Sequence, residues 1–260
     1  MEEGLTSTRT VLCKRYGAFV KGGGEVKKTV LLILAFMLCI CIASAEEIVY
    51  VGVRYSVEAT GYDVTVFWQD GNRPENTLLE SISTLYFKAY PAMRETYGTT
   101  EQKQVRIFLK DAFQMPENVP AYTVGNEIHC SRQFLEKETG NLNCIVHELF
   151  HVVQNGYPQS AQDPLASALC EGLADAARYE YSVYEDSAWS LAKYAEGQSY
   201  MDSYTVTAAF LVWAAETYDE SLCLRLNRIL HEGGDAGAAI EVITGKNIET
   251  LWGLYAEAAK

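Results

Sequence analysis

The sequence has little positive charge. It carries 21 lysine and arginine residues against 34 aspartate and glutamate residues, which gives a net charge of −13 at neutral pH. Nucleic acids and anionic membrane surfaces attract basic proteins, so a chain this acidic is a poor partner for either. We therefore expect no nucleic-acid partner and no binding to an anionic membrane surface.

The sequence also lacks an apolar run of the roughly 20 residues that a membrane span requires. Its most apolar segment, residues 30–43, follows two lysines at positions 27 and 28 and ends in Ala-Ser-Ala at positions 43–45. A basic start, a short apolar stretch and a small-residue end are typical of a secretory signal peptide. We predict that residues 1–45 are removed and that the protein is secreted, extracellular and not stably attached to a membrane. An uncleaved signal anchor is the alternative.

The segment ahead of this leader is unusual. Residues 1–26 are mostly polar, contain three consecutive glycines and show no hydrophobic periodicity. We expect them to lie outside the fold. One hypothesis is that translation starts at position 26, which would make the preceding residues a mis-assigned extension. Residues 46–260 would then form the functional domain.

Cysteine is sparse after residue 45. The net charge of that part of the chain is also more negative than that of the whole chain. Residues 1–45 hold six basic and three acidic side chains, so the remainder holds 15 basic and 31 acidic ones, a net charge of −16. An even number of cysteines in a secreted protein favours disulfides, and a Cys144–Cys170 pair is one candidate. A chain long enough to build its own core can equally keep them as buried thiols. The four cysteines are Cys130, Cys144, Cys170 and Cys223.

The sequence contains no internal repeat and no long linker, which favours a single domain. Segments rich in Val, Ile, Tyr and Phe come early, and segments with apolar residues at helical spacing dominate after residue 140. This order predicts the α+β class. The predicted strands are 46–56, 62–68, 104–109 and a bent pair at 121–130. The predicted helices are 76–97 and, later, 141–155, 164–182, 202–218, 219–232 and 246–258.

Histidine is rare as well, and two of the four histidines stand in one motif. His147 and His151 enclose Glu148 in the segment HELFH. Residues four apart share one face of a helix, so both imidazoles can reach a single ion, and neutral imidazole is a good zinc ligand. Glu148 borders that face and can reach a water on the metal without being a ligand. The alternative is a core helix that carries two hydrogen-bonded histidines by chance.

A tetrahedral catalytic zinc needs a third protein ligand and one open position. The motif that uses a third histidine six residues after the second is absent, because Tyr157 stands there and Gln154 replaces its glycine. Glu171 lies on a second predicted helix, with nineteen residues between it and His151, and the glycine after it permits close approach of another helix. Asp175 follows one turn later. We predict Glu171 as the third metal ligand and Asp175 as the hydrogen-bond acceptor for a ligand imidazole. A polar stripe on a surface helix is the alternative.

These motifs resemble a known family. The segments HELFHVVQ and EGLADAARY are similar to the gluzincin-type zinc peptidases, whose third ligand is a glutamate. The closer resemblance is to the plant basic secretory protein family and its microbial relatives, and it extends over residues 115–258. It is carried further by the segments PAYTVGNEIHCS, SYTVTAAFLVW and ITGKNIETLWGLY. The acidic charge of this chain departs from the basic character for which the family is named.

The resemblance implies a zincin-like fold, with a twisted N-terminal sheet, an active-site helix and a mostly helical C-terminal part. It also implies a Zn2+ cofactor and a peptide or protein substrate, which would add as a strand to a sheet edge at Gly125–Ser131. His129 lies in that segment, and we expect its side chain to face solvent. We expect a monomer.

The chemistry that the resemblance implies is hydrolysis of peptide bonds. Glu148 would be the general base. Tyr204 is our first choice as hydrogen-bond donor to the oxyanion, with Tyr157 and His231 as alternatives. The GxMEN-type signature of one aminopeptidase group is absent, which favours an endopeptidase. Two other hypotheses stay open: a non-catalytic secreted binding protein on a peptidase fold, and an intracellular structural protein with a chance motif.

Overall fold

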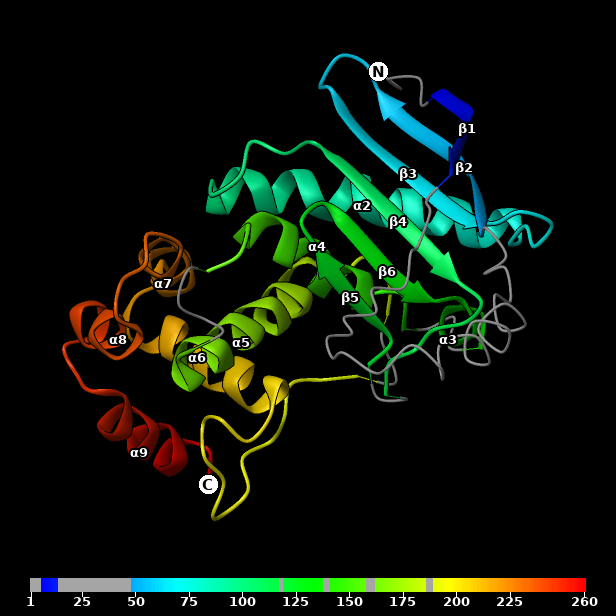
Figure 1. The fold of residues 1–260 in the computed structure, drawn as a ribbon. Coiled ribbons are helices and arrows are strands. Elements are labelled where there is room, and N and C mark those ends of the chain that lie inside the picture. Colours follow the sequence, from blue (N-terminus) through cyan, green and yellow to red (C-terminus); the bar gives the residue numbers. More distant parts are fainter. Residues whose placement is uncertain (1–5, 14–47, 117–118, 138–140, 158–161, 186–188) are drawn as a thin grey trace, which may run out of the picture.

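The computed structural model of the chain describes residues 6–13, 48–116, 119–137, 141–157, 162–185 and 189–260 (Figure 1). The apolar run and the cleavage site of the predicted signal peptide lie outside these ranges, so the leader stays a prediction. Within the described ranges, no helix combines the length and the apolar content needed to cross a membrane.

A six-stranded mixed sheet forms one side of the molecule, with the strand order β1-β2-β3-β4-β6-β5 (Figure 1). β3, β4 and β6 run parallel, whereas β1, β2 and β5 each run antiparallel to their neighbours. β5 is therefore an edge strand. The bounds are Thr6–Cys13 for β1, Val49–Val57 for β2, Tyr62–Gln69 for β3, Gln104–Lys110 for β4, Ala121–Val124 for β5 and Glu127–Ser131 for β6.

The strand β1 differs from what we expected of the first 26 residues. It pairs antiparallel with β2 over its whole length, from Thr6 opposite Ser56 to Cys13 opposite Val49. Without it, the outer backbone groups of β2 would form an open edge, and a segment in which four of the eight residues are Thr or Val is suited to fill such a position. This pairing depends on backbone groups and leaves no clear periodicity in the sequence.

Helix α2, Asn76–Tyr97, covers one face of the sheet and has the bounds that the sequence predicts (Figure 1). Its buried side chains recur at helical spacing and include Ile82 and Tyr86. They share one core cluster with Val66 of β3 and Ile107 of β4. The helix ends at Gly98, whose φ of 62° is accessible to glycine without strain.

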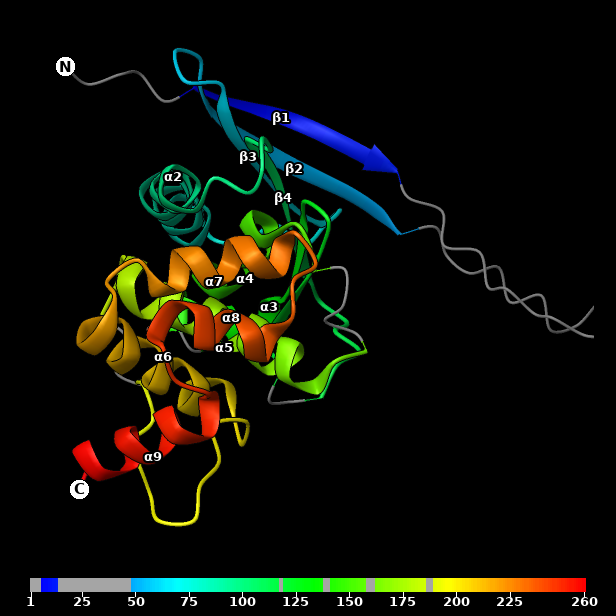
Figure 2. The same ribbon diagram turned by 90° about the vertical axis from the view of Figure 1, so that its left-hand side faces the viewer.

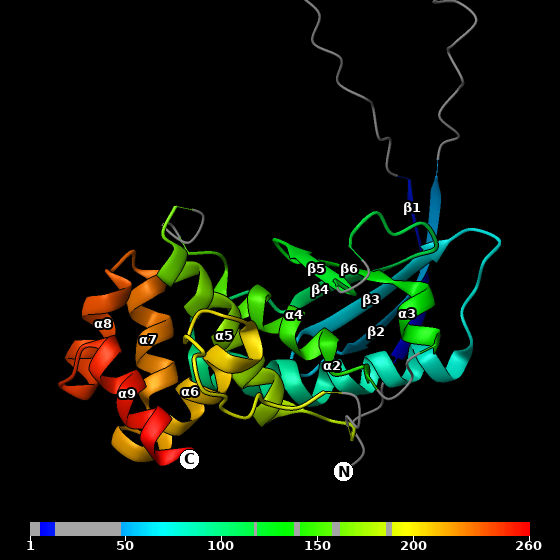
Figure 3. The same cartoon turned by 90° about the horizontal axis from the view of Figure 1, so that it is seen from below.

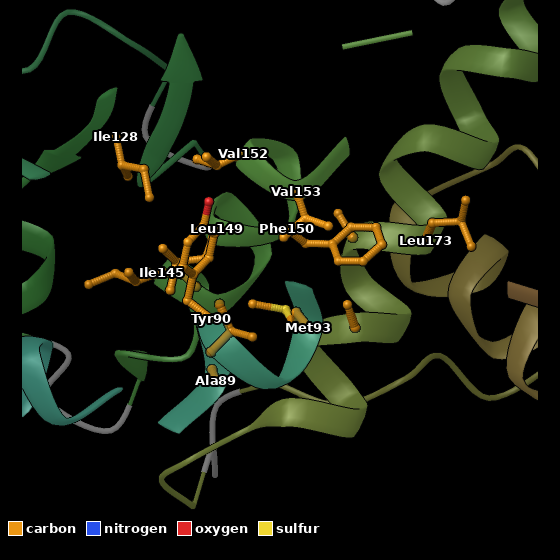
Figure 4. Packing of buried hydrophobic residues seen from close by; sticks show 14 of the residues in the cluster. Ala89, Tyr90, Met93, Ile128, Ile145, Leu149, Phe150, Val152, Val153 and Leu173 are labelled. Carbon is orange, nitrogen blue, oxygen red and sulfur yellow. The ribbon is translucent and has the colours of Figure 1, made fainter. Parts of the chain in front are cut away.

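Helix α4, Cys144–Gln154, packs against α2, α5 and β5 and so connects the sheet to the helical part of the molecule. Figure 4 shows Leu149 and Phe150 of α4 among Ile128 of β6, Met93 of α2 and Leu173 of α5, all of them fully buried. A helix that is apolar on nearly every side must be buried. Its few polar side chains therefore need partners within the protein.

The remaining described helices lie mostly at the end of the molecule opposite β1 and β2 (Figures 2 and 3). They are α3 at Arg132–Lys137, α5 at Pro164–Tyr181, α6 at Tyr204–Tyr218, α7 at Leu222–His231, α8 at Ala236–Thr244 and α9 at Ile248–Ala258. The predicted helices match α4, α5, α6, α7 and α9 to within a few residues, and the architecture agrees with the predicted α+β class.

The short helices α3 and α8 were not predicted from the sequence. The segment before α8 contains Gly233-Gly234 and the helix itself contains Gly237, and glycines favour a loop in a sequence-based prediction. Asp235 starts α8 by accepting a hydrogen bond from the backbone N–H of Ala238 at 2.6 Å. Such a cap offsets the low helix propensity of the glycine.

Candidate metal centre

Helix α4 is short, and both of its ends are fixed by hydrogen bonds. The side chain of Asn143, which is fully buried, accepts from the backbone N–H groups of Val183 and Tyr184 at 3.1 and 3.3 Å. It also donates to the carbonyl of Tyr184 at 2.6 Å. At the other end, Asn155 adopts a left-handed conformation and its N–H donates to the carbonyl of His151 at 3.1 Å. The start of α4 is thereby tied to the segment that follows α5, and the two helices keep a fixed separation.

Three side chains from these two helices direct their ligand atoms to one place. The Nε2 atoms of His147 and His151, both on α4, are 3.1 Å apart. The Oε2 atom of Glu171, on α5, lies 3.2 Å from the first and 3.5 Å from the second. Zinc–ligand bonds of about 2.0–2.1 Å in a tetrahedron place neighbouring ligand atoms about 3.3–3.4 Å apart. The three predicted ligands therefore come together with the spacing that a tetrahedral metal site needs.

The outer nitrogen of each imidazole is also held. His147 Nδ1 lies 2.7 Å from Asp175 Oδ1, as the sequence predicts. His151 Nδ1 lies 2.6 Å from Gln154 Oε1, a partner that the sequence analysis missed. The amide of Gln154 can have only one orientation, because its Nε2 donates to the carbonyl oxygen of Cys170 at 2.9 Å. Its oxygen thus accepts the proton of His151 Nδ1, which leaves Nε2 of His151 with a free lone pair for a metal.

The charges of the site favour a cation at its centre. Burial lowers the pKa of His147, but hydrogen bonds with Asp175 and Glu171 outweigh it and raise that pKa to about 9. Burial acts to raise the pKa of Glu171, yet the hydrogen bonds with His147 and His151 hold it well below its usual range. An ionised carboxylate and two imidazoles held this close require positive charge, which protons or a metal ion can supply.

Glu148 lies beside the three ligands but faces the sheet. It is buried, and its Oε2 accepts a hydrogen bond of 2.7 Å from the hydroxyl of Thr123 on β5. The carboxylate lines the same cleft as the ligand trio and is not part of that trio. This matches the expected position of a group that reaches a water on the metal rather than the metal itself. The partner Thr123 was not predicted.

The close helix approach expected at the glycine after Glu171 is present, and the partner is α6. A Cβ atom on Gly172 would lie 2.4 Å from Cγ2 of Thr207, well inside van der Waals contact. Only glycine fits there without displacing α6. The approach brings the first residue of α6, Tyr204, to the edge of the candidate site.

Of the two candidate oxyanion donors that line the cleft, Tyr204 and Tyr157, Tyr204 is the exposed one. It is 54% exposed, and its ring lies nearly parallel to that of His147 with a centroid distance of 6.1 Å. The negative charge of Glu171 is the main cause that raises the pKa of Tyr204. Tyr157 is buried, and its hydroxyl already donates to Asn227 Oδ1 at 2.6 Å.

His231 lies behind the site instead of in it. Its Nδ1 is 3.1 Å from the backbone carbonyl of Gln154, and it is the last residue of α7. It therefore contacts the end of α4 and is not among the residues that line the cleft.

The structure corrects the expected sheet edge. β6 is an interior strand between β4 and β5, so the edge is formed by Ala121–Val124 and not by Gly125–Ser131. His129 on β6 does not face solvent, because it is 5% exposed and its ring stacks between Phe108 and Tyr122 at centroid distances of 5.0 and 4.8 Å. The sequence predicts the β5–β6 hairpin but does not indicate which of its two strands is paired on both sides.

The thiols of Cys130, Cys144, Cys170 and Cys223 are free, so the candidate Cys144–Cys170 disulfide is not formed. Cys170 instead donates its thiol to Gln154 Oε1 at 3.3 Å. Cys144 is buried and stands outside the ligand trio. Burial raises the pKa of Cys130 and Cys223, which keeps both as thiols.

A comparison with protein families gives one match, to the family described as peptidase of plants and bacteria, over residues 61–255. The matched range begins one residue before β3, ends in α9 and includes His147, Glu148, His151, Glu171 and Asp175. No curated protein matches the chain.

Proposed function

The chain belongs to this family of plant and bacterial peptidases, which implies peptide or protein substrates, and we propose that it is a secreted zinc-dependent endopeptidase with a zincin-like fold. The observation that carries the proposal is the convergence of His147, His151 and Glu171 at separations of 3.1 to 3.5 Å with Glu148 next to them. This convergence supports a gluzincin-type site, in which two histidines of one helix and a glutamate of the next would bind the metal.

His147, His151 and Glu171 would hold the metal. A zinc ion supplies a Lewis acid that polarises a carbonyl group and lowers the pKa of a water molecule toward neutrality. Asp175 and Gln154 keep the two imidazoles oriented with their Nε2 lone pairs inward. The three side chains that would hold the metal line the cleft, where a substrate carbonyl can enter.

Glu148 takes the proton of the attacking water and passes it to the leaving amine nitrogen. Its place in the cleft, outside the ligand trio, supports this role. The hydroxyl of Tyr204 donates to the oxyanion that forms from the substrate carbonyl. The raised pKa of Tyr204 keeps that proton in place at neutral pH.

The substrate binds in extended form along β5. An edge strand has unpaired backbone N–H and C=O groups that can pair with a peptide. Ala121, Tyr122 and Thr123 of β5 line the cleft that also contains Glu148. A peptide that passes along an open strand edge has no need to end at the site, which supports cleavage of internal bonds.

Secretion is part of the proposal and is supported by the leader-like residues 27–45 and by the acidic charge of the rest of the chain. N-terminal sequencing of the protein recovered from the culture medium tests it. A start near residue 46 is expected, which would also remove β1 and leave β2 at the edge of the sheet. An intact leader in a membrane fraction would contradict the proposal.

The decisive experiment measures bound zinc and the cleavage of a mixed peptide library by the purified protein and by Glu148→Gln. We expect one zinc per chain in both proteins and internal cleavage by the wild type alone. A zinc-loaded wild type that cleaves nothing would favour the non-catalytic binding protein. A wild type that binds no stoichiometric zinc would overturn the site itself.

A further inference from the structure

The carboxylate of Glu148 has a partner on another element, and this partner is the hydroxyl of Thr123. The Oγ1 atom of Thr123 lies 2.7 Å from Oε2 of Glu148 and 3.0 Å from its backbone carbonyl oxygen. The two residues are 25 positions apart, one on the edge strand β5 and the other on α4. A hydroxyl has one proton to donate, and the shorter contact to an ionised carboxylate is the stronger of the two.

The direction of this hydroxyl is set by the strand. Threonine is branched at Cβ and has few side-chain rotamers, so the backbone of β5 determines where Oγ1 points. β5 pairs with β6 on one side only, from Ala121 opposite Cys130 to Val124 opposite Glu127. A change in the position of this edge strand is therefore transmitted to the carboxylate of Glu148.

We propose that Thr123 is a positioning residue that orients the Glu148 carboxylate for proton transfer and links it to the strand along which the substrate binds. The inference rests on the proposed function, in which Glu148 is the general base. A base must lie within hydrogen-bond reach of the proton that it takes, and a shift of about 1 Å can cost on the order of 100-fold in rate. The hydroxyl engages one carboxylate oxygen and leaves the other for the reacting water.

A purely structural role is the competing explanation, because the contact with the backbone carbonyl also fastens β5 to α4. The two explanations predict different kinetics. A loosened strand would weaken substrate binding and raise KM, whereas a misplaced base would lower kcat and leave KM and zinc binding unchanged.

The test compares three substitutions in the full-length protein. Thr123→Val keeps the shape and the strand propensity but removes the hydroxyl, Thr123→Ala removes it with less bulk, and Thr123→Ser keeps it. We expect Val and Ala to lower kcat by roughly 10- to 100-fold at a KM within about twofold of wild type, and Ser to restore kcat to within about threefold. Zinc stoichiometry should stay at one per chain throughout.

Thr65→Val is the matched control, since it makes the same change in β3 of the same sheet, and its kcat should equal that of wild type. The inference is overturned if Val and Ala retain wild-type kcat, if Ser is as impaired as Val, or if only KM changes. These results would leave the proposed function intact. A zinc-loaded wild type that cleaves no peptide would overturn the proposed function and this inference with it.

Discussion

The two imidazoles of the candidate site are oriented by different chemistry. His147 is held by a carboxylate from the neighbouring helix, Asp175, whereas His151 is held by an amide from its own helix, Gln154. A carboxylate both orients an imidazole and increases its basicity through its charge, but an amide only orients it. The orientation of His147 therefore depends on a charged partner, whereas the orientation of His151 depends on a network of neutral hydrogen bonds.

The neutral network extends well beyond His151. Gln154 Nε2 donates to the hydroxyl of Tyr157, which donates to Asn227 Oδ1 on α7. Asn227 Nδ2 in turn donates to the hydroxyl of Thr99 after α2, at 3.4 Å. The orientation of His151 thus depends on segments far apart in the sequence, and the network is costly to interrupt because its polar groups are buried.

The largest effect is expected from removing the carboxylate that both imidazoles share. Glu171 contacts both, so Glu171→Gln should abolish stoichiometric zinc binding and, with it, all peptide cleavage. Equilibrium dialysis against zinc measures this. Glu180→Gln on the same helix is the matched control, because that residue is exposed and lies outside the ligand trio. Full zinc binding by Glu171→Gln would contradict the assignment of the third ligand.

Loss of the charged partner should have the next largest effect. Asp175→Asn keeps the shape but can turn an N–H toward His147 Nδ1, which would favour the tautomer with a proton on Nε2. We expect zinc affinity to fall by roughly 10- to 100-fold. Chelator competition measures the affinity. An unchanged affinity would mean that the carboxylate has no role in orienting His147.

Loss of the neutral partner should act on the fold as much as on the metal. Gln154→Leu removes the bonds to Tyr157 and to the Cys170 carbonyl, so two buried groups lose a partner. We expect the metal-free protein to lose about 1–3 kcal/mol of unfolding free energy and zinc affinity to fall by about 10-fold. Denaturant unfolding and chelator competition report the two effects separately. If only affinity changed, the network would have no structural role.

The smallest expected effect is the pH dependence of stability that arises from the charged pair of His147 and Asp175. The pKa of His147 is raised to about 9 in the folded, metal-free protein, compared with about 6.5 in an unfolded chain. Its contribution to stability is therefore complete below pH 6.5 and is lost as the pH rises through 9. The melting temperature of chelator-treated protein should fall over this window, and Asp175→Asn should flatten the decline. Zinc affinity should rise over the same window, because protons compete with the metal.

Features that depend on local spacing could be predicted from the sequence. The four-residue spacing of His147 and His151 and the helical period of the segment with Glu171 and Asp175 place all four side chains on defined helix faces. The bounds of α2 follow from the same periodicity. Gln154 could have been found too, since it lies three residues after His151 on one face of α4.

Features that depend on tertiary packing could not be predicted. Thr123 reaches Glu148 because the β5–β6 hairpin packs on α4, and no sequence pattern indicates this contact. The choice of β5 over β6 as the edge depends on the parallel pairing of β6 with β4. The hydrogen bond from the Cys170 thiol to the side-chain oxygen of Gln154 likewise depends on the packing of α5 against α4.

Because Gly172 and Thr207 are in close contact, substitutions at these positions could change the width of the cleft. One added methyl group at position 172 would act as a wedge that moves the start of α6, and Tyr204 with it, away from the ring of His147. A smaller residue in place of Thr207 would leave room for that methyl group, so that α6 could return to its original position. Substitutions at these two positions could therefore vary the width of the cleft without altering any of the candidate metal ligands.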